Sequence, residues 1–140
     1  MNIIKSLFSW KHRYFKRKLR GVESMVLDLE FKRSKSQMIR EEVRQEYDKS
    51  KAKLDILQSQ IKAQKDKPSM EEGEIKRLDD NEVLLKRDIE RYEAQMKQID
   101  LDIAGTQPTN DYPDGVSGIN DQLDSLRELK QMITEYIRQL

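Results

Sequence analysis

The sequence of 140 residues contains no cysteine and a single histidine. Without thiols the chain can form neither disulfides nor thiolate metal sites, and one imidazole cannot build a zinc site. His12 lies in a basic run with no carboxylate beside it, so we interpret it as a surface cation. No nucleophile has the general base that it would need. The sequence therefore predicts no catalytic residue, no metal site and no cofactor, and we expect a protein that is not an enzyme.

Oxygen-rich groups do not change this expectation. On helices this charged, pairs of acids one turn apart are typical of solvated faces and local ion pairs; the pairs are Glu71 with Glu74 and Glu90 with Glu93. Four oxygen-bearing residues in one loop fail the EF-hand spacing, and no glutamate closes the set: Asn110, Asp111, Asp114 and Ser117. No glycine pattern typical of nucleotide binding occurs. We expect no small-molecule substrate.

Glycine, proline and long apolar runs are also scarce. Five glycines and three prolines leave few turn signals, which favours long helices over a sheet. No apolar run approaches the roughly 18 residues of a membrane span, and residues 1–20 are too interrupted by charge for a secretory signal. A charged fraction of 38% and a mean hydropathy of -0.91 leave little apolar surface for a thick core. We expect a cytoplasmic protein, and the sequence leaves open a place at the periphery of a membrane or inside a larger assembly.

The clearest pattern present is an apolar stripe between residues 75 and 103. Its members alternate at three- and four-residue spacing, interrupted only by Glu82: Ile75, Leu78, Leu85, Ile89, Tyr92, Met96, Ile99 and Ile103. Such spacing over about four heptads predicts a coiled-coil helix that faces a partner helix. Ser69 and Glu72 fit a capping box behind Pro68, so we predict this helix from about Ser69 to Ala104.

A second stripe predicts the helix that pairs with the first. Its members leave Ser50 at a gap: Val43, Tyr47, Leu54, Leu57 and Ile61. We predict one helix from about Val22 to Gln64 and, with a turn near residues 65–69, an antiparallel coiled-coil hairpin over residues 22–104. Counting outward from the turn sets the expected pairs: Leu57 with Leu78, Tyr47 with Ile89, and Asp100 and Asp102 with Arg33 and Lys35.

A loop over residues 105–119 and a shorter C-terminal helix over residues 120–140 complete the predicted all-α fold. Tyr112 to Gly115 reads as a turn, because Pro113 fixes φ and Gly115 accepts a positive φ. Asn120 is the predicted cap of the third helix. This helix has a wide apolar face, which predicts packing in a three-helix bundle or at a subunit interface. The predicted association residues are Leu123, Leu126, Leu129, Ile133 and Ile137.

The first 20 residues carry seven Lys or Arg and no acid, interleaved with aromatic side chains. Residues 1–40 hold a charge of about +8 and residues 41–140 about −7, which suggests attraction between copies or to an anionic surface. We predict a basic amphipathic N-terminal arm over residues 1–21, with Gly21 as a candidate hinge. The candidate binding residues are Phe8, Trp10, Lys11, Arg13, Tyr14, Phe15, Lys16, Arg17, Lys18 and Arg20.

Several partners fit this arm. Bulky apolar residues followed by cations suit shallow insertion into an anionic membrane surface. A groove on a helical protein partner also fits, and so does nucleic acid, where cations meet phosphates and aromatic rings stack on bases. The arm could instead continue the bundle and bury its aromatic rings against the third helix or another copy. We expect a structural or assembly protein that forms homo-oligomers or docks on a helical partner, with a nucleic-acid-binding accessory protein, such as a phage or virion assembly component, as the alternative.

Overall fold

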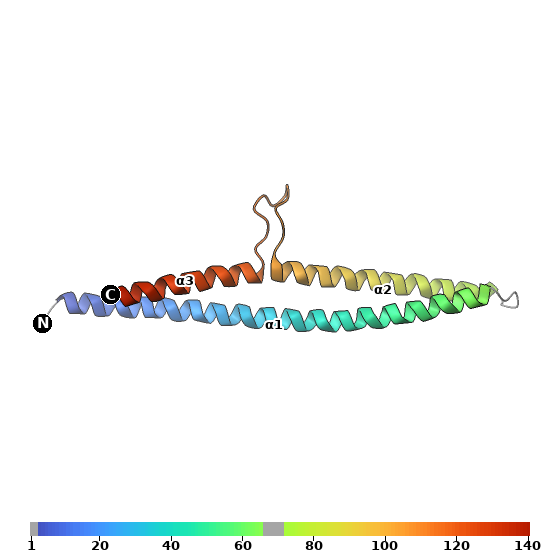
Figure 1. Cartoon of the computed structure of the whole chain (residues 1–140), viewed down its shortest axis with the longest axis horizontal. Helices are drawn as coiled ribbons and strands as arrows, with labels where there is room; N and C mark the ends of the chain where they lie inside the picture. Colours follow the sequence, from blue (N-terminus) through green and yellow to red (C-terminus); the bar gives the residue numbers. More distant parts are fainter. Residues whose placement is uncertain (1–2, 66–71) are drawn as a thin grey trace. The chain divides into compact units, whose positions relative to one another are not determined.

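The computed structural model describes the backbone of residues 3–65 and 72–140, and the side chains of residues 9–64 and 72–140. Within this part of the chain there are three α-helices and no strand (Figure 1). They are α1 (Ile3–Lys65), α2 (Glu72–Ala104) and α3 (Ile119–Gln139). The predicted all-α class with three helices is confirmed. The expected turn near residues 65–69, with Pro68 and the Ser69 cap, lies outside the described residues.

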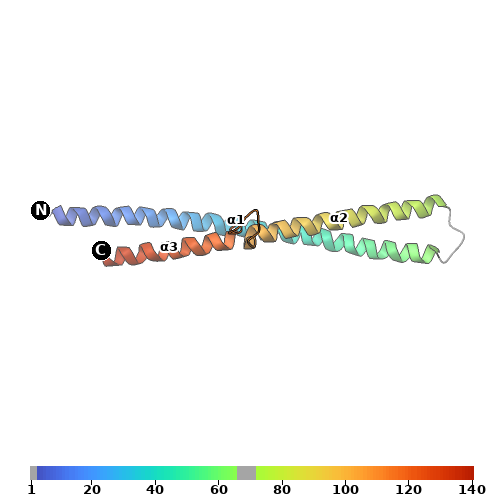
Figure 2. The same ribbon diagram turned by 90° about the horizontal axis from the view of Figure 1, so that it is seen from above.

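The chain divides into two compact units, and α1 and α2 contribute residues to both. Unit 1 comprises Met1–Ser36 and Asp100–Leu140, and unit 2 comprises Gln37–Ile99. In unit 1, α3 lies beside the first part of α1 and runs in the opposite direction (Figures 1 and 2). In unit 2, α2 lies beside the later part of α1, again in the opposite direction. Each unit is therefore built on one pair of antiparallel helices.

In unit 1 the helix that was expected to start near Val22 begins at Ile3 and passes through Gly21 without a break. The predicted hinge at Gly21 is therefore wrong. A glycine inside a helix costs only about 1 kcal/mol relative to alanine, and α3 holds α1 on both sides of this position. Phe15 packs against Tyr136 before Gly21, and Glu23 pairs with Lys130 after it.

Unit 1 also contains the loop between α2 and α3. Backbone hydrogen bonds within the loop hold its two sides together. Gly105 has φ +87 and donates its N–H to the carbonyl of Leu101 at 2.7 Å, which ends α2 with a left-handed residue. The Thr106 N–H donates to the Val116 carbonyl at 2.9 Å, so the two sides of the loop are joined. The Gly115 N–H donates to the Tyr112 carbonyl at 2.9 Å, which confirms the predicted turn.

The start of α3 in unit 1 differs from the prediction. Its N-cap is Gly118, not Asn120, and no side chain caps the helix. Gly118 packs against the backbone of Gly105 so closely that a Cβ there would overlap it. The Asn120 side chain is engaged elsewhere, because its Oδ1 accepts a hydrogen bond from Arg33 Nη1 at 3.1 Å. The cap is therefore chosen by close packing of two glycines.

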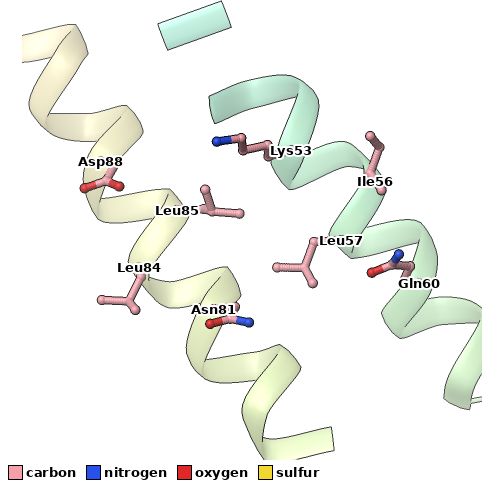
Figure 3. Close-up of a pocket in the computed structure, with 8 residues that line it drawn as sticks. All are labelled: Lys53, Ile56, Leu57, Gln60, Asn81, Leu84, Leu85 and Asp88. Atoms are coloured by element: carbon pink, nitrogen blue, oxygen red, sulfur yellow. The ribbon is translucent and has the colours of Figure 1, made fainter. Parts of the chain in front are cut away.

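Unit 2 buries a narrow seam between its two helices. Leu57, Ile61 and Ile89 are buried, and Ser50 is a buried polar residue of the same unit. Leu57 and Leu85 project into the space between α1 and α2 (Figure 3). Members of both predicted apolar stripes therefore lie between the helices of this pair.

The helix register in unit 2 differs from the expected one. Leu57 was expected beside Leu78, and in the structure it lines a groove with Leu84 and Leu85. Tyr47 was expected beside Ile89, and its hydroxyl donates to Glu93 Oε1 at 3.1 Å. A shift of about one turn keeps the same faces in contact, so the stripes alone did not determine the register.

Candidate functional site

The predicted basic residues line one continuous stretch of α1. The side chains of Lys11, Arg13, Lys16, Arg17, Lys18 and Arg20 are all exposed. Trp10 is 62% exposed beside them, whereas the Phe8 side chain lies outside the described set. Arg13 Nη2 donates a hydrogen bond to Ser9 Oγ at 3.1 Å. This stretch therefore presents a dense positive charge next to a large exposed indole ring.

The aromatic residues of the same stretch form a chain of contacts that ends on α3. Trp10 stacks on Tyr14 with ring centroids 5.8 Å apart, and Tyr14 meets Phe15 edge-on at 5.2 Å. Phe15 packs against Tyr136 of α3 at 4.6 Å. Lys18 Nζ lies 5.5 Å from the centre of the Tyr14 ring. The segment is thus docked on the third helix at Phe15, one of the alternatives left open by the sequence, while Trp10 faces outward.

The five predicted association residues do not share one environment. Leu123 is fully buried and belongs to the core of unit 1, together with Val22 and Ile119. Three others are half-buried: Leu126, Ile133 and Ile137. Leu129 is 42% exposed. Most of this set therefore packs inside the chain, and only Leu129 presents a large part of its surface outward.

Leu129 borders an open groove on unit 1. The rest of the groove comes from one side of α1 and is lined by Tyr14, Arg17, Lys18, Gly21, Val22 and Met25. Nothing lies within 4 Å of the position that a Cβ on Gly21 would occupy. The lining of the groove is thus mostly apolar, and it includes one glycine and two cations, Arg17 and Lys18.

Three polar contacts that the sequence did not suggest join α3 to α1. Arg33 binds Asn120 as described above, Arg127 Nη2 lies 3.1 Å from Glu30 Oε1, and Lys130 Nζ lies 3.8 Å from Glu23 Oε1. The partners are separated by about a hundred positions in the sequence, and single charged residues carry no pairing signal of their own. A match of opposite charges, made after the third helix was placed, could have revealed the two ion pairs but not the bond between Arg33 and Asn120.

Unit 2 carries a perturbed titratable group on α1. The pKa of Lys51 is raised, first by its hydrogen-bonding interaction with Tyr47 and then by the charges of Tyr47, Glu93 and Asp55. Lys86 Nζ lies 2.9 Å from Glu82 Oε1, so the acid that interrupts the predicted stripe takes part in an ion pair. Both arrangements are local contacts between charged and polar side chains on the helix surface.

Metal-binding clusters and membrane-spanning helices are absent from the described part of the chain. Among these residues no group of three or more His, Cys, Asp or Glu side chains is placed to hold a metal ion. None of the described helices combines the length and the apolar character that a membrane span requires. Neither a protein-family model, nor a curated protein, nor a solved structure matches this chain.

Proposed function

We propose that this chain is a non-enzymatic structural protein that uses antiparallel coiled-coil helix pairs as a scaffold and attaches to an anionic membrane surface through the start of α1. The observation that carries the proposal is the exposure of every cation from Lys11 to Arg20 beside the outward-facing Trp10. Cations near an anionic bilayer contribute about 1 kcal/mol each, and indole rings favour the interfacial region. In this proposal the membrane anchor is the first part of the long helix α1, and it is not a separate arm.

The thin cores of the two units support a scaffold role. Within the described residues only six hydrophobic side chains are buried, and they are divided between two helix pairs: Val22, Leu57, Ile61, Ile89, Ile119 and Leu123. In the same part of the chain fifteen large hydrophobic side chains are exposed. Helix pairs of this kind offer long surfaces for association and no enclosed space for chemistry.

A membrane is favoured over single-stranded nucleic acid by the aromatic geometry. Stacking on bases requires free ring faces, and Trp10 and Tyr14 each already have one face covered by the other. Phe15 is likewise covered by Tyr136. The cations could still neutralise phosphates, so nucleic acid is retained as an outcome of the test.

Vesicle flotation tests the proposal. The chain should float with vesicles that contain phosphatidylserine and stay behind with phosphatidylcholine alone, and salt should weaken the binding. The triple variant Arg13→Ala, Lys16→Ala, Arg20→Ala should weaken it by about 100-fold, because three cations at about 1 kcal/mol each are removed. Trp10→Ala should weaken it further.

A matched variant removes the same charge from exposed positions of unit 2: Lys62→Ala, Lys76→Ala and Lys97→Ala. It should float like the wild type. Equal losses in the two triple variants would show attraction by net charge alone and contradict a localised anchor. Binding to a single-stranded oligonucleotide without any flotation would assign the cations to nucleic acid.

A further inference from the structure

The groove on unit 1 is lined in part by a glycine that no contact within the chain explains. Gly21 lies inside a helix of 63 residues, where glycine is about 1 kcal/mol less favourable than alanine. It does not serve as a hinge, because α1 is continuous there. It does not allow close packing within the chain either, since nothing lies within 4 Å of its missing Cβ. The space over Gly21 is open to a group from outside.

The charges around the groove indicate what that group carries. On α1 the exposed charged residues from Lys11 to Arg20 are all cations. On α3, Arg127 and Lys130 pair with acids of α1. The acids of α3 are exposed and form no ion pair within the described part of the chain: Asp121, Asp124, Glu128 and Glu135. Arg138 is the remaining cation of α3 and is exposed. The four acids outnumber it, so α3 can supply the negative charge that complements Arg17 and Lys18 of α1.

We infer that the groove of unit 1 binds unit 1 of a second copy of this chain, with α1 of each copy seated on α3 of the other. This inference rests on the assembly role proposed above and names the partner. A two-fold axis parallel to the helices places the groove cations Arg17 and Lys18 of each α1 against the unpaired acids on α3 of the other copy. A perpendicular two-fold axis would instead bring two copies of Arg17 and Lys18 together, and like charges disfavour it.

The contacts within unit 1 fix which residues meet in this arrangement. Phe15 lies opposite Tyr136, and Glu23 lies opposite Lys130. Gly21 is therefore level with the α3 residues between those two, where Met132 is 66% exposed. Met132 of the second copy fills the space over Gly21, and Glu135 of the second copy lies beside Arg17. Trp10 lies beyond the turn that packs on Tyr136, so it stays available to the membrane.

Sedimentation equilibrium of the full chain tests the inference at Gly21. The wild type should have twice the 16.7 kDa mass of one chain at tens of micromolar. Gly21→Gln places an uncharged side chain in the groove, and it should weaken dimerisation by about tenfold or more while helix content is kept, because glutamine favours helix over glycine. Gly73→Gln changes the other described helical glycine with open space around it, and this control should dimerise like the wild type.

Charge exchange tests the pairing. Arg17→Glu alone and Glu135→Arg alone should each weaken the homodimer by about tenfold. Mixing the two variants should restore a dimer, because one of its two contacts then joins the two substituted side chains and the other joins the two native ones. Opposite charges meet at both contacts of that mixed dimer. Recovery in the mixture would require contact between copies, which a change in folding cannot imitate.

The opposing results are equally specific. A wild type that stays monomeric, a dimer that tolerates Gly21→Gln, or a mixture that does not recover would each overturn the inference. Vesicle binding by a monomeric chain would leave the proposed anchor intact and remove only the dimer. A dimer that does not bind anionic vesicles would support the dimer and contradict the proposed membrane anchor.

Discussion

The two units use the same architecture, a pair of antiparallel helices, and hold it together differently. In unit 1 the helices are joined by two ion pairs and a hydrogen bond, and Leu123 is fully buried. In unit 2 the buried residues each keep 7–8% exposure, and the Tyr47 hydroxyl donates a hydrogen bond to Glu93 across the helices. Stability in unit 1 is therefore concentrated at a few positions, and in unit 2 it is spread along a seam.

Removing the central leucine of unit 1 gives the largest expected effect. Leu123→Ala should lower the free energy of unfolding by about 2–5 kcal/mol, because it leaves a cavity at a fully buried position. Hydrogen exchange should show the loss along α3 and the first part of α1. Ile89→Ala in unit 2 is the comparison variant, and its smaller cost should appear in α2. Uniform loss of protection in both units would show that they unfold as one.

The glycine at the start of α3 gives the next effect. A Cβ on Gly118 would lie 2.5 Å from the carbonyl oxygen of Ile103, so Gly118→Ala should cost about 1–3 kcal/mol as the backbone shifts. Gly73→Ala in unit 2 meets open space and should be neutral or stabilising by up to about 1 kcal/mol. Thermal unfolding followed by circular dichroism measures both. Opposite signs are expected, and a neutral Gly118→Ala would contradict close packing at the loop.

The difference between the two units also explains which parts of the fold the sequence could predict. In unit 2 the stripes from Val43 to Ile61 and from Ile75 to Ile99 are regular, so helix and apolar face follow directly from spacing. The spacing of the two stripes does not determine the register between α1 and α2 along their axes. The predicted register therefore differs from the observed one by about one helical turn. The few interactions that settle register, such as Tyr47 with Glu93, depend on single side chains.

In unit 1 the difficulty was the choice of partner. The apolar face of α3 was recognised, yet spacing does not say which helix covers it, and the start of α1 looked like a separate basic arm. The polarity of that stretch made an exposed anchor the natural interpretation. Aromatic packing has the opposite effect. Contact with Tyr136 stabilises the Phe15 ring more than exposure to water does, so this part of α1 packs on α3. The charges of the candidate site were thus predicted, and its contact with α3 through Phe15 was one of the alternatives that the sequence left open.

The hydrogen bonds between helices offer a finer comparison. Asn120→Ala removes the acceptor of a partly buried Arg33 and should cost about 1–2 kcal/mol, because a bond to a charged group is lost. Tyr47→Phe removes an exposed bond to Glu93 in unit 2 and should cost about 0.5–1 kcal/mol. Urea unfolding of the two variants measures the difference. A larger effect for Tyr47→Phe would reverse the view that polar contacts matter more in unit 1.

The smallest expected effect concerns the ion pairs of unit 1. Arg127 with Glu30 and Lys130 with Glu23 have side chains that are between 39% and 48% exposed, so each pair should contribute only about 0.2–1 kcal/mol. Arg127→Met and Lys130→Met keep the apolar part of each side chain and remove its charge. Their cost should be measurable at low salt and should vanish near 1 M salt, where the Debye length is about 3 Å. If the cost persists at high salt, the apolar stems of Arg127 and Lys130 hold α3 to α1, and the charges of these two pairs contribute little to unit 1.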